Sequence, residues 1–125
     1  MQYSYGDAIN KIKFAEIIGQ YSFTTSADDV YTSNVMKLKE IAPNAVQGYY
    51  PYLYGYYDEN TSTLTGIWSS VSHPEAYIES SCVSGGFRFK FYRKNGEIGF
   101  SGTSRCGDNE FGYYDDINYW EGTQI

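Results

Sequence analysis

The sequence predicts an α+β domain in which one or two N-terminal helices pack on an antiparallel β-sheet of about four strands. Three observations predict this class. Apolar residues recur at near-helical spacing in the first third of the chain, the middle is tyrosine-rich, and an Asn-Gly pair separates two alternating segments. A chain of 125 residues has the length of one domain, 1–125. We expect a helical part over 1–45, an antiparallel sheet over 46–105 and an acidic C-terminal loop over 106–125.

Two helices are predicted in the N-terminal part. The first covers residues 7–21, with Asp7 as its cap and an apolar stripe made by Ala8, Ile9, Ile12, Ala15, Ile17 and Ile18. The second covers residues 26–42, because Ser26 can cap it and Pro43 cannot continue it. Its buried side would hold Val30, Val35, Leu38 and Ile41. The Thr and Ser residues at 32 and 33 are also compatible with a loop.

Strands are predicted from residue 46 onward. Between Tyr49 and Tyr57, tyrosine recurs at every second position, which is typical of an extended segment. Pro51 indicates an edge strand or an irregular start. Residues 63–69 would return antiparallel after a turn, and residues 76–82 form a short strand.

A β-hairpin is the clearest local signal. Phe87, Phe89 and Phe91 alternate with polar residues, and Asn95-Gly96 is the preferred pair for a two-residue type I′ turn. This turn predicts a register in which Lys94 faces Glu97, Phe91 faces Phe100 and Arg88 faces Thr103.

The charge of the chain restricts its partners. The formal net charge is −6 and the pI is about 4.6, which argues against binding to nucleic acid or to an anionic membrane surface. The sequence contains no run of apolar residues long enough for a transmembrane helix, and its start lacks an apolar signal core. The chain is either natively leaderless and cytoplasmic, or a domain whose upstream segment is missing.

Tyrosine is the most unusual component, with 15 residues. Side chains alternate along a strand, so one face of the middle segment would carry Tyr50, Tyr52, Tyr54 and Tyr56. This face is either a binding platform for sugars or a protein partner, or an aromatic layer beneath a helix.

No catalytic constellation stands out in the sequence. The single histidine, His73, precedes a proline and has no nucleophile or carboxylate at a recognised spacing. Cys-x-x-Cys pairs and histidine clusters are absent, so zinc and redox catalysis lack ligands. We therefore expect the protein not to be an enzyme.

Cys82 and Cys106 flank the predicted hairpin. An even cysteine count favours one disulfide in an exported protein, and the alternative is a pair of buried thiols. The predicted register offsets the two residues by a few positions, so a bridge requires Gly85-Gly86 to break the ladder.

The C-terminal segment has the most specific chemistry. Residues 106–125 contain no Lys or Arg but five carboxylates: Asp108, Glu110, Asp115, Asp116 and Glu121. Neighbouring carboxylates repel one another, so a compact loop would gain from a hard cation such as calcium. The alternative is a solvated acidic tail, although Ile117 and Trp120 indicate that the segment packs down.

These C-terminal residues resemble a known family. Gly107-Asp108, Gly112, Asp115-Asp116-Ile117 and Trp120 are similar to the C-terminal calcium loop of the major pseudopilins of type II secretion. The cysteine placement also resembles the disulfide that bounds the C-terminal region of many type IV pilins. The resemblance implies a non-enzymatic subunit that assembles with itself into an extracellular or cell-surface filament. It also implies calcium bound by Asp108, Asp115 and Asp116, with Ile117 and Trp120 as loop anchors.

A second hypothesis needs no filament. The chain would be a small acidic binding or inhibitory module, of the kind that viruses and phages encode. Its tyrosine-rich face and acidic tail would bind a protein or glycan partner.

Overall fold

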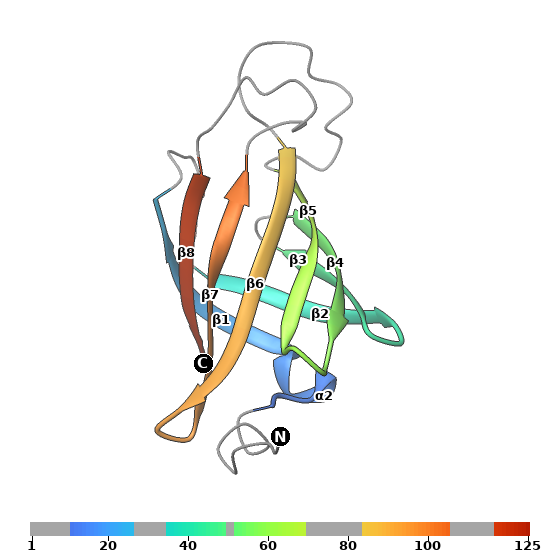
Figure 1. Cartoon of the computed structure of the whole chain (residues 1–125), viewed down its shortest axis with the longest axis vertical. Helices are drawn as coiled ribbons and strands as arrows, with labels where there is room; N and C mark the ends of the chain where they lie inside the picture. The colour runs from blue at the N-terminus through green and yellow to red at the C-terminus, as the bar shows by residue number, and fades with distance from the viewer. Residues whose placement is uncertain (1–10, 27–34, 50–51, 70–83, 106–116) are drawn as a thin grey trace, which may run out of the picture.

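Eight antiparallel strands close into a barrel in the computed structural model (Figure 1). The structure describes residues 11–26, 35–49, 52–69, 84–105 and 117–125. Each strand pairs with the next along the chain, and the last pairs with the first. The elements are a short helix α2 (Phe14–Ile17) and the strands β1 (Gly19–Thr25), β2 (Val35–Ala42), β3 (Ala45–Tyr49), β4 (Tyr52–Asp58), β5 (Thr63–Ser69), β6 (Ser84–Lys94), β7 (Glu97–Arg105) and β8 (Ile117–Gln124).

The predicted α+β class is wrong. Strand makes up 78% of the described residues, and these residues include no N-terminal helix packed on a sheet. β1 covers 19–25 and so replaces the end of the first predicted helix, and β2 covers 35–42 within the second predicted helix. A closed barrel buries the apolar face of its sheet against itself, so it needs no covering helices. Residues 7–10 and 27–34 lie outside the described residues.

The alternation of polarity explains why β1 and β2 are strands. Tyr21 and Phe23 are buried on β1, and Met36 and Leu38 are buried on β2, while their neighbours in sequence are exposed. This period of two is the strand period. The predicted helical stripes relied on apolar residues three or four positions apart, and Phe23 lay between the two predicted helices.

In the middle of the chain, the structure has strands where strands were predicted. The strand over 63–69 is confirmed as β5. The segment from Tyr49 to Tyr57 contains the end of β3 and most of β4, which pair with each other antiparallel. The strand predicted over 76–82 lies outside the described residues.

The predicted hairpin is confirmed, with its register. Lys94 pairs with Glu97, Phe91 with Phe100 and Arg88 with Thr103. Asn95 and Gly96 have φ values of 54° and 83°, and a type I′ turn requires positive φ at both central positions. Beyond β7, the segment predicted as an acidic loop contains the strand β8, which starts at Ile117.

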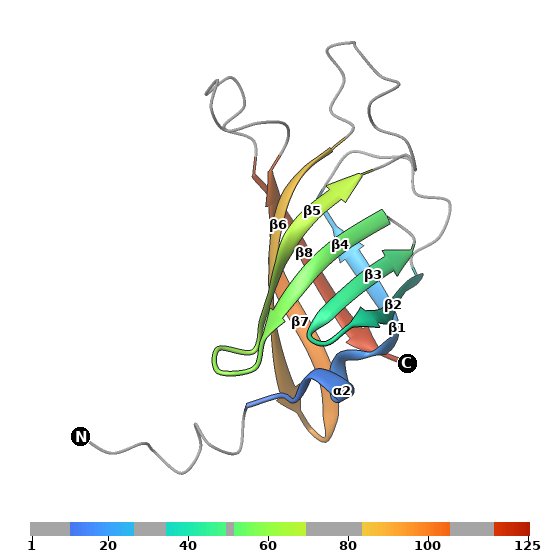
Figure 2. The ribbon, with the colours of Figure 1, turned by 90° about the vertical axis from the view of Figure 1, so that its right-hand side faces the viewer.

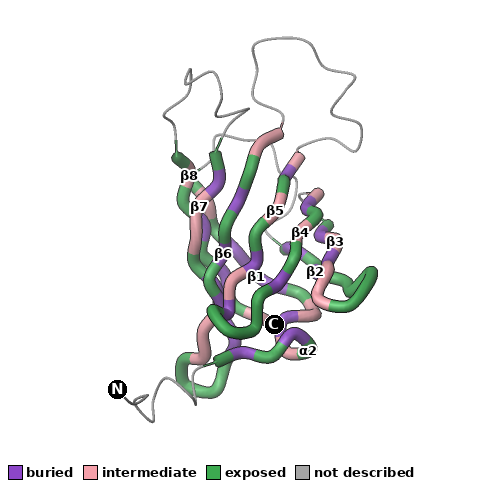
Figure 3. The backbone as a smooth tube through the Cα atoms, turned by 45° about the vertical axis from the view of Figure 1, so that its right-hand side comes forward, coloured by how far each residue is buried: buried purple, intermediate pink, exposed green. Residues whose placement is uncertain are grey.

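Aromatic side chains fill the barrel. Buried residues alternate with exposed ones along the strands (Figure 3). Phe89 connects several rings, because its centroid lies 4.6 Å from that of Phe100 and 5.7 Å from that of Trp120. Further contacts continue toward α2 through Tyr21, Phe91, Tyr57 and Phe14. Eight strands give an interior that side chains can fill, and here the rings form one connected column.

Residues 11–18, which include α2, cross one end of the barrel (Figure 2). The Tyr57 hydroxyl donates to the Ile12 carbonyl at 2.6 Å, and the Tyr21 hydroxyl donates to the Ile17 carbonyl at 2.7 Å. Further hydrogen bonds join the segment to the barrel, among them Ile12 N–H to Ser62 Oγ, Phe14 N–H to Glu59 Oε2, Gln124 Nε2 to the Glu16 carbonyl, and Arg93 to the Glu16 carboxylate. We call residues 11–18 the N-terminal plug.

Removing one hydroxyl tests this plug. Tyr57→Phe leaves the buried Ile12 carbonyl without its partner, so we expect the free energy of unfolding to fall by about 1–3 kcal/mol. Tyr56→Phe is the matched control, because the neighbouring Tyr56 is 61% exposed. Its effect should stay within about 0.5 kcal/mol. Urea denaturation at pH 7 measures both, and equal losses would contradict the anchoring role.

Alkaline pH tests the same contact. Burial raises the pKa of Tyr57 from 10.0 to about 12, although its hydrogen bond with Ser62 opposes the shift. A raised pKa means that the folded state prefers the protonated phenol. The stabilisation is therefore complete below pH 10 and is lost as the pH rises toward 12. Burial raises the pKa of Tyr21 as well, so the two residues act in the same direction.

We expect the wild-type protein to lose about 1 kcal/mol of unfolding free energy by pH 11 through Tyr57. Tyr57→Phe should therefore lose less stability than the wild type when urea denaturation is repeated at pH 8 and pH 11. Parallel losses in the two proteins would show that Tyr57 does not contribute.

Candidate functional site

The outer wall of β3, β4 and β5 carries a group of large side chains. Along β4, Tyr52, Tyr54 and Tyr56 alternate with the buried Leu53 and Tyr57. Three of the four tyrosines predicted on one face therefore point outward, and Tyr50 lies outside the described residues. Ile67 on β5 pairs with Tyr54, and Tyr49 lies at the end of β3. We call Tyr49, Tyr52, Tyr54, Tyr56 and Ile67 the tyrosine patch.

The patch is continuous and accessible. The rings of Tyr49 and Tyr52 meet edge to face with their centroids 5.4 Å apart. The exposed fraction is 56% for Tyr49, 49% for Tyr54, 61% for Tyr56 and 62% for Ile67. In the described part of the chain, helix α2 lies at the end of the barrel and leaves this wall uncovered (Figure 2). The observed exposure does not fit an aromatic layer beneath a helix.

A pair of glycines shapes the sheet that holds the patch. Gly55 and Gly66 face each other across β4 and β5. A Cβ atom at Gly66 would collide with the Tyr54 carbonyl oxygen and would lie 2.6 Å from the Gly55 Cα atom. The two strands therefore approach more closely at this point than side chains would permit. The glycine pair thus fixes the backbone from which Tyr54, Tyr56 and Ile67 project.

Cationic residues border the patch. Lys37 on β2 pairs with Tyr49, and Lys39 lies two residues further along the same strand. On the other side, Arg88 on β6 pairs with Thr65, which pairs with Tyr56. All nine Lys and Arg residues lie in the described part of the chain, but only six of the fifteen Asp and Glu residues do. The described barrel therefore has a cationic surplus, although the whole chain is acidic.

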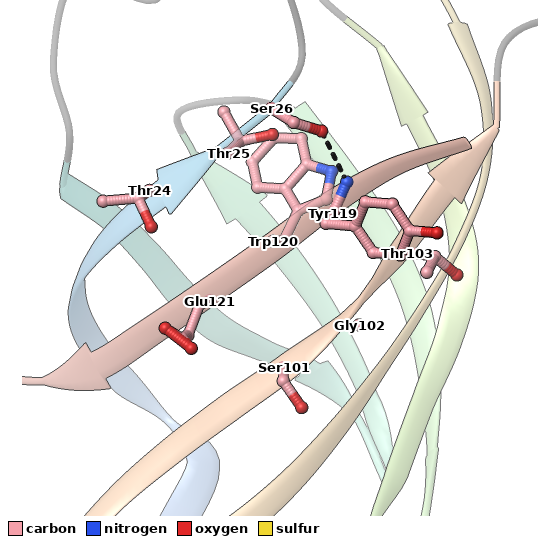
Figure 4. Close-up of a pocket in the computed structure, with 9 residues that line it drawn as sticks. All are labelled: Thr24, Thr25, Ser26, Ser101, Gly102, Thr103, Tyr119, Trp120 and Glu121. Carbon is pink, nitrogen blue, oxygen red and sulfur yellow. Dashed lines mark hydrogen bonds between the residues drawn. The ribbon is translucent and has the colours of Figure 1, made fainter. Parts of the chain in front are cut away.

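A second feature is a hollow on the outer wall of β1, β7 and β8 (Figure 4). It has a volume of about 640 Å³ and is lined by Thr24, Thr25, Ser26, Ser101, Gly102, Thr103, Tyr119, Trp120 and Glu121. Most of these side chains carry hydroxyls. The Tyr119 ring extends over β7 toward Thr103 and is 63% exposed. We call this hollow the hydroxyl groove.

The two predicted loop anchors lie on β8. Trp120 is buried, stacks on Phe23 at 5.3 Å between centroids, and donates its indole N–H to Ser104 Oγ at 2.9 Å. Ile117 is exposed at the start of the strand. Trp120 therefore belongs to the aromatic column of the barrel.

The other predicted site residues cannot be placed. Asp108, Asp115, Asp116, Cys82 and Cys106 all lie outside the described residues. The calcium site and the disulfide therefore stay predictions. Among the residues that are described, there is no group of three His, Cys, Asp or Glu side chains that could hold a metal ion.

The sequence could have revealed Ile67. In the strand predicted over 63–69, the alternation that buries Leu64 and Trp68 points Ile67 outward with Thr63 and Thr65. The hydroxyl groove could not be found in this way, because one of its walls is β1, part of which was predicted as helix.

No family model, curated protein or solved structure matches the chain. The described residues contain no helix that is long and apolar enough to cross a membrane. The pseudopilin resemblance stays a prediction, because most of the residues that carry it lie outside the described ranges.

The glycine pair beneath the patch can be tested directly. Gly66→Ala places a Cβ atom against the backbone of β4, so we expect a loss of about 2 kcal/mol or more in the free energy of unfolding. Gly86→Ala is the matched control on the adjacent strand β6. Its Cβ atom would meet nothing closer than the Gly66 carbonyl oxygen at 3.7 Å, and its effect should stay within about 0.5 kcal/mol. Urea denaturation compares the two, and similar stabilities would contradict the close approach of β4 and β5.

Proposed function

We propose that this protein is a non-enzymatic binding module that docks on a partner protein through the tyrosine patch. The observation that carries the proposal is the patch itself, four tyrosines and an isoleucine that are contiguous on the outer wall of β3, β4 and β5. Soluble proteins seldom leave large apolar side chains gathered in this way unless the surface binds something.

The chemistry of the patch suits a protein surface. Tyrosine is enriched at protein interfaces because its ring gives a large contact area at low entropic cost, while its hydroxyl still bonds to polar groups. Gln47 shows how such a hydroxyl is used, because its amide lies 3.4 Å from the Tyr54 hydroxyl oxygen. Ile67 adds apolar contact next to Tyr54.

The barrel determines the mode of recognition. Because β1 and β8 pair, the described strands present no unpaired edge to which a partner could add a strand. Recognition on this wall must therefore use side chains. The sheet beneath them is held by pairing on both sides, so little conformational entropy is lost on binding.

The charge around the patch defines the partner further. Lys37 and Lys39 border it on one side and Arg88 on the other, while Asp58 and Glu59 lie at its Tyr56 end. A partner with an apolar centre and acidic residues at its rim would match this arrangement, because opposite potentials steer two surfaces into register. We therefore propose an acidic protein surface as the occupant of the patch.

A double variant tests the proposal. Tyr54→Ser combined with Ile67→Ser removes the centre of the patch at two exposed, directly paired positions. We expect it to fold normally and to weaken partner binding at least about a hundredfold, because truncating large central side chains commonly costs about 2 kcal/mol or more. The measurement is quantitative affinity enrichment from cells that express the protein, followed by titration of the recovered partner.

Ile125→Ser is the matched control, because it removes an apolar side chain that is 72% exposed and belongs to neither the tyrosine patch nor the hydroxyl groove. The proposal predicts proteins that the wild type and this control enrich equally and the double variant does not. Identical enrichment by all three proteins would contradict it. A wild-type dimer that the double variant converts to a monomer would also contradict it, since the occupant would then be a second copy.

A further inference from the structure

We propose that the hydroxyl groove is a second binding site and that it takes a neutral sugar unit. Eight of the nine lining residues come from three consecutive strands of the closed barrel, β7, β8 and β1, and Ser26 directly follows β1. The hollow has a volume of about 640 Å³ and is open to solvent, so a ligand would lie along the wall with one face on the protein. The site depends on none of the residues of the tyrosine patch.

The strand register arranges the groove as two rows. In one row Glu121 pairs with Thr24 on one side and with Ser101 on the other. In the second row Tyr119 pairs with Thr103 and is bonded to Ser26. Neighbouring strands are about 4.8 Å apart, so a ring-sized ligand lying across β8 can reach the side chains of all three strands.

The aromatic member of the groove is held in place through its backbone. The Tyr119 N–H donates to Ser26 Oγ at 2.9 Å, and the Ser26 N–H donates to the Tyr119 carbonyl at 2.9 Å (Figure 4). The bond to the Tyr119 carbonyl joins the two backbones one residue beyond Thr25, and the bond from the Tyr119 N–H goes to the Ser26 side chain. The backbone that carries the exposed ring is therefore fixed, and the ring face is available for stacking.

The polar side chains of the groove have unused capacity. Toward other described residues, the side chains of Thr24, Ser101, Thr103 and Glu121 make no hydrogen bond or ion pair. Hydroxyls can donate and accept, whereas an ionised carboxylate only accepts. A matching ligand must therefore offer several donors and acceptors at short spacing, together with an apolar face for Tyr119.

The charges select a neutral ligand. Glu121 is the one charged residue in the lining, so it repels an anion. Arg88 pairs with Thr103, and Lys90 pairs with Ser101, so cationic residues border the groove and offset the attraction of Glu121 for a cation. A sugar ring is neutral, carries hydroxyls that both donate and accept, and has C–H faces that pack on an aromatic ring.

Titration of the whole chain tests this proposal. The probes are four neutral disaccharides, maltose, cellobiose, lactose and chitobiose, added to the isotope-labelled protein while its amide resonances are followed by NMR. We expect at least one probe to shift resonances of β1, β7 and β8 around Tyr119 and Glu121. Tyr119→Ala should weaken that affinity about tenfold or more, and Glu121→Gln should weaken it about fivefold because the replacement accepts a weaker hydrogen bond.

Tyr56→Ala is the matched control, because Tyr56 is an outward tyrosine of similar exposure on β4. It should bind the disaccharide as the wild type does, and so should the double variant at Tyr54 and Ile67. The amide spectra of the variants show directly whether each one is folded.

Three results would overturn the proposal. The first is that none of the four probes shifts the groove resonances at tens of millimolar. The second is that Tyr119→Ala binds as tightly as the wild type. The third is that glucuronate or glucosamine, the charged probes, binds more tightly than every neutral one. Because the double variant leaves the groove intact, loss of sugar binding and loss of protein binding are separate outcomes.

Discussion

The structure depends on the pairing of β1 with β8. Five residue pairs, from Tyr21 with Gln124 to Thr25 with Trp120, join two strands that lie about a hundred residues apart in sequence. This contact turns a meander of hairpins into a closed surface. Closure gives every described strand a hydrogen-bonding partner on both sides and defines an inside and an outside for the whole chain. Each position on a strand then belongs to the core or to the outer wall.

The inside is occupied by rings, and this restricts where binding can occur. Tyr21, Tyr57, Phe89, Phe91 and Phe100 are almost completely buried and touch one another in a connected column. At one end the N-terminal plug covers the column, and its backbone carbonyls accept hydrogen bonds from the hydroxyl groups of Tyr21 and Tyr57. Because these rings occupy the interior, a ligand is not expected to bind among them. The candidate sites accordingly lie on the outer wall, where alternation places tyrosine, threonine and serine.

The sequence predicted those parts of the fold whose signals are local. The hairpin of β6 and β7 could be derived with its register, because Asn95-Gly96 fixes the turn and the phenylalanines of β6 fix the faces. β5 followed from the same alternation. The first third of the chain failed because isoleucine, leucine and alanine at spacings of three and four satisfy a helix, whereas the deciding contact of β1 is with a strand at the other end of the chain. A contact between residues so far apart in sequence cannot be detected from the apolar periodicity within a window of about fifteen residues.

The candidate sites also contain parts that the sequence alone could predict and parts that required the fold. The outward direction of Tyr52, Tyr54 and Tyr56 follows from the strand period alone, so the sequence was sufficient for that part of the patch. The outward direction of Ile67 follows from the same period, whereas the cationic border required the order of the strands, because its residues come from β2 and β6. The hydroxyl groove required closure itself, since Thr24 and Ser26 come within reach of Ser101 and Thr103 only when β1 lies beside β8.

Net charge is a poor guide to what this protein binds on its wall. The whole chain carries −6, and that value argues against anionic partners at long range. The described residues, however, include every Lys and Arg of the chain and six of the fifteen Asp and Glu residues. Fields from separated charges are screened over about 8–10 Å at physiological ionic strength, so a partner in contact with the wall responds mainly to the residues beneath it. Around the tyrosine patch those residues include Lys37, Lys39 and Arg88, with Asp58 and Glu59 at the Tyr56 end. Apart from that end, the local surface favours an acidic partner even though the chain as a whole is acidic.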